Sequence, residues 1–186
     1  MQDNAKERCL DKADAIDILD RTIDFIRNCE NKASICLGTF GVILTILLST
    51  EGIDNLKSII YSAVTQLTFC NILYLLMFFV SVSITIHGLY QIIKVLGVNV
   101  NSPEEEGIEG DSKIFFEPIS RNKYKEYKKK LFSLTEDEFL NNIVSEIYIN
   151  SCICSEKYRS YKLGLKRTIV GFCAFVILWI IGIIIF

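Results

Sequence analysis

Residues 168–186 read TIVGFCAFVILWIIGIIIF and contain no charged residue. At about 1.5 Å per residue, a helix of this length crosses the roughly 30 Å of hydrocarbon in a bilayer. Residues 33–50 and 67–93 are also free of Asp, Glu, Lys and Arg. None of the three stretches has the apolar–polar alternation of a strand. We therefore predict an all-α membrane protein with three transmembrane helices, at 33–50, 67–93 and 168–186.

The composition agrees with this prediction and excludes several classes of protein. Of the 186 residues 51% are hydrophobic, and the mean hydropathy is +0.34. The net charge of −2 argues against a nucleic-acid partner held by a basic surface. A single histidine disfavours a histidine-rich metal site or a histidine-dependent hydrolase. The seven cysteines are odd in number, and Cys152 and Cys154 have no second pair nearby, so we expect reduced thiols and no bound metal.

The distribution of basic residues predicts the orientation. Residues 1–32 hold six Lys and Arg, residues 51–66 hold one, and residues 94–167 hold thirteen. The positive-inside rule therefore places 1–32 and 94–167 in the cytoplasm, and makes 51–66 a short external connection. We expect a multi-pass protein of the bacterial inner (plasma) membrane. Residues 33–50 do not begin the chain and have no small-residue cleavage site after them, so we expect them to be retained as a span.

A short heptad seam precedes the first span. Cys9, Ile16 and Ile23 lie seven residues apart, and Leu19 and Ile26 follow the last two by three residues. This spacing predicts a helix that continues into the first span. Its apolar face could pair with a partner helix or pack within its own monomer, and the spacing does not distinguish these.

The second cytoplasmic region contains a loop and a long helix. Residues 98–111 are rich in Pro, Glu and Gly and are predicted to be a loop. Thr135 and Glu138 have the spacing of a capping box, so we predict that a helix begins there. We expect this helix to continue without a break into the third span.

Small residues recur along the first span. Ser34 and Gly38 lie four residues apart, as do Gly41, Thr45 and Ser49. Rows of this kind allow membrane helices to approach closely, within a protomer or between protomers. We expect a homo-oligomer.

No catalytic constellation is present in the sequence. The motifs of serine hydrolases, zinc proteases and glycine-rich phosphate loops are all missing, so we expect no enzymatic activity and no cofactor. His87 lies toward the cytoplasmic end of the second span, where an ionisable residue is a functional candidate by default. It could equally be an ordinary interfacial residue beside Tyr90.

Two segments combine basic and aromatic residues: 113–117 (KIFFE) and 156–162 (EKYRSYK). A small anionic ligand that carries a base would be recognised by such groups, through a guanidinium fork and an aromatic face. Alternatively, Lys157, Arg159, Lys162, Lys166 and Arg167 anchor the helix at anionic headgroups.

Three short segments resemble signatures of the Pycsar effector transmembrane family. Residues 28–35 (NCENKASI) resemble its opening acid-x-Lys-Ala signature. Residues 114–117 (IFFE) resemble its second, and 147–148 (IY) followed by 156–159 (EKYR) resemble its third. The resemblance covers residues 14–186, in the expected order.

The resemblance implies a bacterial antiphage effector. In that family a dedicated cyclase makes cyclic CMP or cyclic UMP after infection, and the membrane effector senses it and impairs the inner membrane, which causes abortive infection. The ligand-contact candidates combine charge, aromaticity and motif match: Lys32, Phe115, Phe116, Lys157, Tyr158 and Arg159. The alternatives are a membrane anchor that recruits a cytoplasmic partner, and a related effector gated by cyclic oligonucleotides.

Overall fold

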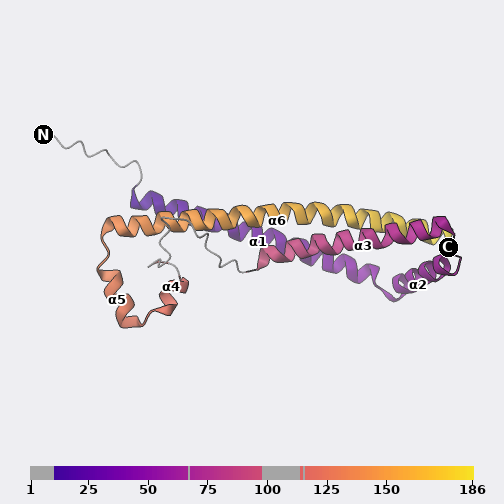
Figure 1. Cartoon of the computed structure of the whole chain (residues 1–186), viewed down its shortest axis with the longest axis horizontal. Coiled ribbons are helices and arrows are strands. Elements are labelled where there is room, and N and C mark those ends of the chain that lie inside the picture. The colour runs from indigo at the N-terminus through magenta and orange to yellow at the C-terminus, as the bar shows by residue number, and fades with distance from the viewer. Residues whose placement is uncertain (1–10, 67, 98–113, 115) are drawn as a thin grey trace. The chain divides into compact units, whose positions relative to one another are not determined.

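The computed structural model describes residues 11–66, 68–97, 114 and 116–186, with the backbone alone at 116–118. Every regular element within these residues is an α-helix, which confirms the all-α prediction. The helices are α1 (Lys12–Leu47), α2 (Thr50–Thr65), α3 (Phe69–Leu96), α4 (Phe116–Arg121), α5 (Tyr124–Phe132) and α6 (Glu136–Ile185) (Figure 1). The predicted loop at 98–111 lies outside the described residues.

Three of the helices, α1, α3 and α6, are long and apolar enough to cross a membrane, as predicted. Both α1 and α6 extend well beyond their apolar stretches, because α1 begins at Lys12 and α6 at Glu136. The predicted helical extensions, continuous with the first and third spans, are therefore confirmed.

The start of α6 is fixed by the predicted capping box. The backbone N–H of Glu138 donates to Thr135 Oγ1 at 3.2 Å, and the Thr135 N–H donates to Glu138 Oε2 at 2.9 Å. These two bonds satisfy donors that the first turn of a helix leaves open. Glu136 and Asp137 add negative charge at the positive end of the helix dipole.

The chain forms two units: Met1–Asn28 with Val98–Glu156, and Cys29–Gly97 with Lys157–Phe186. In the first unit the Lys12 ammonium lies 4.4 Å from the centroid of the Phe139 ring, a cation–π contact between α1 and α6.

The predicted heptad seam is only partly covered in the first unit. Ile16 and Ile23 remain exposed, while Leu19 and Ile26 are half-buried. Cys9 lies outside the described residues.

The second unit contains the three apolar helix segments and α2. Glu30 of α1 bonds to Lys157 of α6, and farther along both helices the Phe40 ring lies 5.2 Å from the Phe172 ring. The residue numbers rise together, so α1 and α6 run parallel. On α3 the order is reversed, because Tyr74 Oη donates to the Leu178 carbonyl oxygen at 2.9 Å and Thr85 lies opposite Gly171. Helix α3 is therefore antiparallel to α6.

Small residues allow α3 and α6 to approach closely. The row consists of Ser81, Thr85 and Gly88 on α3, and Gly164, Thr168 and Gly171 on α6. A Cβ atom placed on Gly171 would lie 2.6 Å from Thr85 Oγ1 and 2.9 Å from the Ser81 carbonyl oxygen. The same two helices are in backbone contact near Gly88 and Gly164. This is the small-residue packing typical of membrane helices, in a row that the sequence analysis did not single out.

The connection predicted at 51–66 folds as helix α2. Its N-terminus is capped by Ser49, whose hydroxyl accepts a hydrogen bond from the Gly52 N–H at 3.4 Å. Ile59 and Ala63 are buried along one face, and Ile59 lies against α6 at Gly182. The sequence analysis did not predict this helix.

Candidate functional site

A buried lysine lies at the C-terminal end of α3. The Lys157 Nζ donates to Glu30 Oε1 at 2.8 Å, to the Val95 carbonyl oxygen at 2.5 Å and to the Gly97 carbonyl oxygen at 3.0 Å. An ammonium group has three N–H donors, so these contacts use all of them. We call these four residues the Lys157 junction.

The position of Lys157 has a simple electrostatic cause. The last carbonyl groups of a helix have no partner within the helix and lie at the negative end of its dipole. At the end of α3 the backbone turns away at Gly97, with φ −63° and ψ 143°, and Lys157 takes up two of these carbonyl oxygens. Its side chain is 7% exposed, whereas that of Glu30 is 39% exposed. The junction therefore joins α1, α3 and α6, with its carboxylate at the edge.

An apolar cluster borders the junction. Cys29 and Ala33 of α1 and Ile92 and Val95 of α3 are fully buried together. Residues that are partly buried against them are Cys36, Leu37, Tyr158 and Tyr161. The junction is thus a polar group set against a packed core.

The predicted ligand contacts fall into different environments. Lys157 is buried in the junction, and Tyr158 is half-buried against the apolar cluster. Lys32 and Arg159 are exposed, and within the described part of the chain neither makes a hydrogen bond or an ion pair.

The two candidate phenylalanines cannot be placed in a site. Phe115 lies outside the described residues, and Phe116 is the first residue of α4, without a described side chain. The structure thus brings Lys157 and Tyr158 to the middle of α1 and the C-terminal end of α3. The partners of Lys157, namely Glu30 and the α3 carbonyls, were missed by sequence reasoning.

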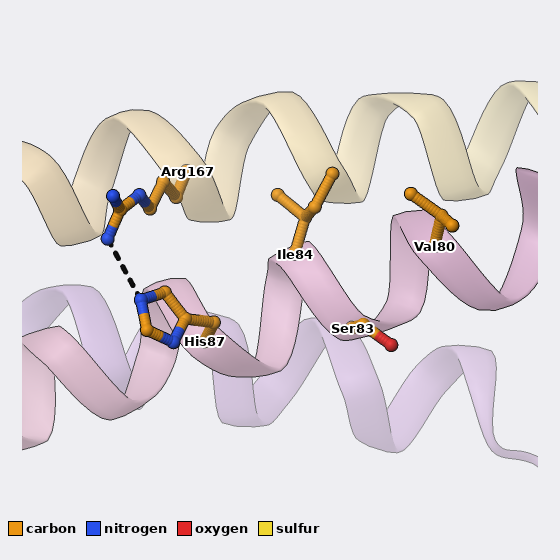
Figure 2. Close-up of a pocket in the computed structure, with 5 residues that line it drawn as sticks. All are labelled: Val80, Ser83, Ile84, His87 and Arg167. Atoms are coloured by element: carbon orange, nitrogen blue, oxygen red, sulfur yellow. Dashed lines mark hydrogen bonds between the residues drawn. The ribbon is translucent and has the colours of Figure 1, made fainter.

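A second polar pair joins α3 and α6. Arg167 Nη1 lies 2.9 Å from His87 Nε2 (Figure 2). Because the guanidinium can only donate, His87 Nε2 is the acceptor in this contact. The pair lines an open groove of about 530 Å³ together with Val80, Ser83 and Ile84. We call this the His87–Arg167 groove.

A family model described as the Pycsar effector protein domain matches residues 14–185. The chain belongs to this family. It is 25% identical to the Pycsar effector protein GmPycTM of Gulbenkiania mobilis over 182 residues, which cover 90% of each chain. It is 29% identical to EcPycTM of Escherichia coli over 143 residues, which cover 76% of this chain and 74% of that relative. No solved structure matches it.

The resemblance stated from the sequence is therefore confirmed, and the chain is a membrane effector of a Pycsar antiphage defence family. Two of the segments that carried the resemblance meet in the second unit. Glu30 and Ala33 come from the first segment, and Lys157 and Tyr158 from the third. Glu30 and Lys157, which are 127 positions apart in the sequence, thus form one junction beside the apolar cluster.

Proposed function

We propose that this Pycsar effector senses a cyclic pyrimidine mononucleotide, cyclic CMP or cyclic UMP, made by a cognate cyclase, and then impairs the integrity of the inner membrane. The observation that carries the proposal is the family match over residues 14–185 in a chain with three helices able to span a bilayer. Loss of membrane integrity would end the infected cell's support of phage. The protein itself carries out no reaction in this scheme.

The proposed ligand contacts are Lys32, Phe115, Phe116, Lys157, Tyr158 and Arg159. The exposed cations of Lys32 and Arg159 are free to contact a cyclic phosphate, and an arginine can do so through two parallel hydrogen bonds. Lys157 differs from both, because all three of its donors are occupied. It can reach a phosphate only if the ligand displaces Glu30, the one partner in the junction that is a mobile side chain.

Such a displacement would couple ligand binding to the membrane helices. Lys157 joins α1, α3 and α6, and each of these helices contains an apolar stretch long enough to span a bilayer. A ligand shifts a conformational equilibrium only by its difference in affinity for the two states. We infer that the ligand-bound state is one in which the contact between Lys157 and Glu30 is broken.

We place the N-terminus and residues 94–167 in the cytoplasm, on the basis of the distribution of lysines and arginines. In this orientation the junction lies at the inner face of the membrane, where a ligand made in the cytoplasm would meet it. Helix α2 and the end of α6 lie at the outer face.

Replacing Arg159 with glutamine is expected to raise, by roughly tenfold or more, the nucleotide concentration at which a membrane-impermeant dye enters cells that produce the effector. Loss of a charged hydrogen bond costs about 1.5–3 kcal/mol, a drop in affinity of roughly tenfold or more. Lys129→Gln is the control, because it removes an exposed cation from α5. Dye entry is measured with cyclic CMP and with cyclic UMP.

Entry that requires one of the two nucleotides would identify the base. A response to neither would refute the mononucleotide proposal, and a response to a cyclic oligonucleotide would favour that class of ligand instead.

We also propose that the effector self-associates through α1. The small residues of its first span are exposed, and no described atom outside the helix's own backbone lies within 4 Å of a Cβ placed on Gly38 or Gly41. Within the described part of the protomer, no other helix packs against Gly38 or Gly41. Close approach of two such rows gains van der Waals contact between helix backbones.

Replacing Gly38 with leucine is expected to weaken self-association at least several-fold while leaving the protomer folded. The added side chain would separate two α1 helices that meet at this row. Sedimentation in detergent measures the change, with Thr39→Leu as the control, because this exposed residue of the same helix is rotated by about 100° from Gly38. An unchanged oligomer distribution in the Gly38 variant would exclude this face as the contact.

A further inference from the structure

The His87–Arg167 groove has a polar end and an apolar end. His87, Ile84, Ser83 and Val80 follow one another along one face of α3, and Arg167 reaches the polar end from α6 (Figure 2). The four α3 residues have the i, i+3, i+4, i+7 spacing of a single helix face. The eight residues from Val80 to His87 extend about 10 Å along the helix axis.

The groove crosses the boundary of the apolar stretches. Arg167 is the last charged residue of α6 before the uncharged residues 168–186, and on α3 no charged residue precedes Lys94. The polar end therefore lies where the hydrocarbon gives way to lipid headgroups, and Val80 and Ile84 lie deeper. All five lining residues are exposed at the surface of the monomer.

Arg167 has donors to spare in this groove. Its guanidinium carries five N–H groups, and one nitrogen, Nη1, contacts His87. Within the part of the chain that the structure describes, no carboxylate pairs with Arg167. A guanidinium that is planar, exposed and held in place by a neighbouring ring suits a phosphate oxygen pair.

We propose that the His87–Arg167 groove binds one phospholipid of the surrounding membrane. The lipid phosphate lies on Arg167, and an acyl chain follows Ile84 and Val80 into the bilayer. The volume of about 530 Å³ is within the usual range for small-molecule sites, about 300–1,000 Å³. A free phosphate would leave the apolar end unfilled, so the two ends together select a lipid. Net-anionic lipids are favoured, because no carboxylate among the described residues neutralises the positive charge of Arg167.

The test is native mass spectrometry of the full chain released from nanodiscs of phosphatidylglycerol and phosphatidylcholine. The wild type is expected to retain one tightly bound phosphatidylglycerol. Arg167→Gln is expected to weaken its retention roughly tenfold or more, because a charged hydrogen bond is lost. Lys166→Gln makes the same change of charge at the adjacent position, outside the groove, and is expected to retain the lipid.

A second variant addresses the apolar end without touching Arg167. Ser83→Trp places a large side chain in the groove and is expected to lower lipid retention to a similar extent. Circular dichroism and size-exclusion chromatography establish that each variant is folded. Retention at the wild-type level in both Arg167→Gln and Ser83→Trp would overturn the proposal. So would displacement of the lipid by millimolar inorganic phosphate, which would identify a simple anion site.

Discussion

Replacing Gly171 with leucine is expected to force α3 and α6 apart and to lower the melting temperature of the purified chain by roughly 6–12 °C. A Cβ on Gly171 would lie 2.6 Å from Thr85 Oγ1, 2.7 Å from the Thr85 backbone nitrogen and 2.9 Å from the Ser81 carbonyl oxygen. Two of these three atoms belong to the backbone of α3, so no side-chain rotation relieves the overlap. The expected loss is about 3 kcal/mol, at the upper end of the range for an overpacked core.

Gly41→Leu is the matched control for this prediction. It adds the same side chain to a glycine in another apolar helix, where a Cβ meets no described atom within 4 Å. At protein concentrations low enough to keep the chain monomeric, its melting temperature is expected to stay within about 2 °C of the wild type. Equal losses in the two variants would show that leucine in any apolar helix is harmful, and would refute the specific role of the α3–α6 contact.

The three long helices could be predicted because their signal is local. An uncharged stretch of about 20 residues has one favourable structure in a bilayer, a spanning helix. The capping box is recognised from two residues, Thr135 and Glu138, that lie only three positions apart. Helix α2 was missed because its apolar residues are buried by contact with α6, which the sequence of 51–66 alone does not indicate. Ile59 is buried next to Gly182, more than 120 positions away, and the same sequence without that contact is a plausible loop.

The α3–α6 contact uses one of two rows of small residues in the sequence, and the spacing did not indicate which row would pack inside the protomer. Small residues occur at similar intervals in the first span, where Gly38 and Gly41 have open space, and in α6, where Gly171 has none. The spacing alone cannot tell a row that packs inside the protomer from one that faces outward. The choice depends on which faces of α1, α3 and α6 turn toward one another, and that is a property of the whole bundle.

The same limit applies to the candidate ligand contacts. Lys157 and Arg159 are both basic residues of one short motif, and sequence reasoning treated them alike. Two positions along a helix correspond to a rotation of roughly 200°, so the two side chains leave α6 on nearly opposite faces. Lys157 is buried between the middle of α1 and the C-terminal end of α3, and Arg159 is exposed.

Replacing Lys157 with methionine is expected to lower the free energy of unfolding by roughly 3 kcal/mol. Methionine keeps the length of the side chain but leaves the carbonyl oxygens of Val95 and Gly97 without their donor. Removal of one partner from a buried ion pair typically costs about 3–5 kcal/mol. The lower end applies here, because Glu30 is 39% exposed and its carboxylate can be rehydrated. Chemical denaturation in detergent measures the difference.

A double-mutant cycle with Glu30→Gln separates the ion pair from the carbonyl contacts. The amide of glutamine removes the negative charge of Glu30 and leaves the α3 carbonyls in contact with Lys157. Residues in direct contact show coupling energies of about 0.5–3 kcal/mol. Because the carboxylate is partly exposed, a coupling near 1 kcal/mol is expected, with most of the loss in Lys157→Met coming from the carbonyls. A coupling close to the full effect of Lys157→Met would instead assign the stability to the ion pair.

The stability and ligand-binding roles of Lys157 can then be separated by comparison with Arg159. If Lys157 holds α1, α3 and α6 together, Lys157→Met lowers both stability and the nucleotide response, whereas Arg159→Gln lowers the response alone. Glu30→Gln provides the decisive third measurement, because it weakens the contact that a phosphate would have to displace. In that variant, nucleotide should act at lower concentrations. The fold-decrease should correspond to about the coupling energy measured in the cycle. A Lys157→Met variant with wild-type stability would contradict this scheme, because the lysine would then contact the ligand without holding the three helices together.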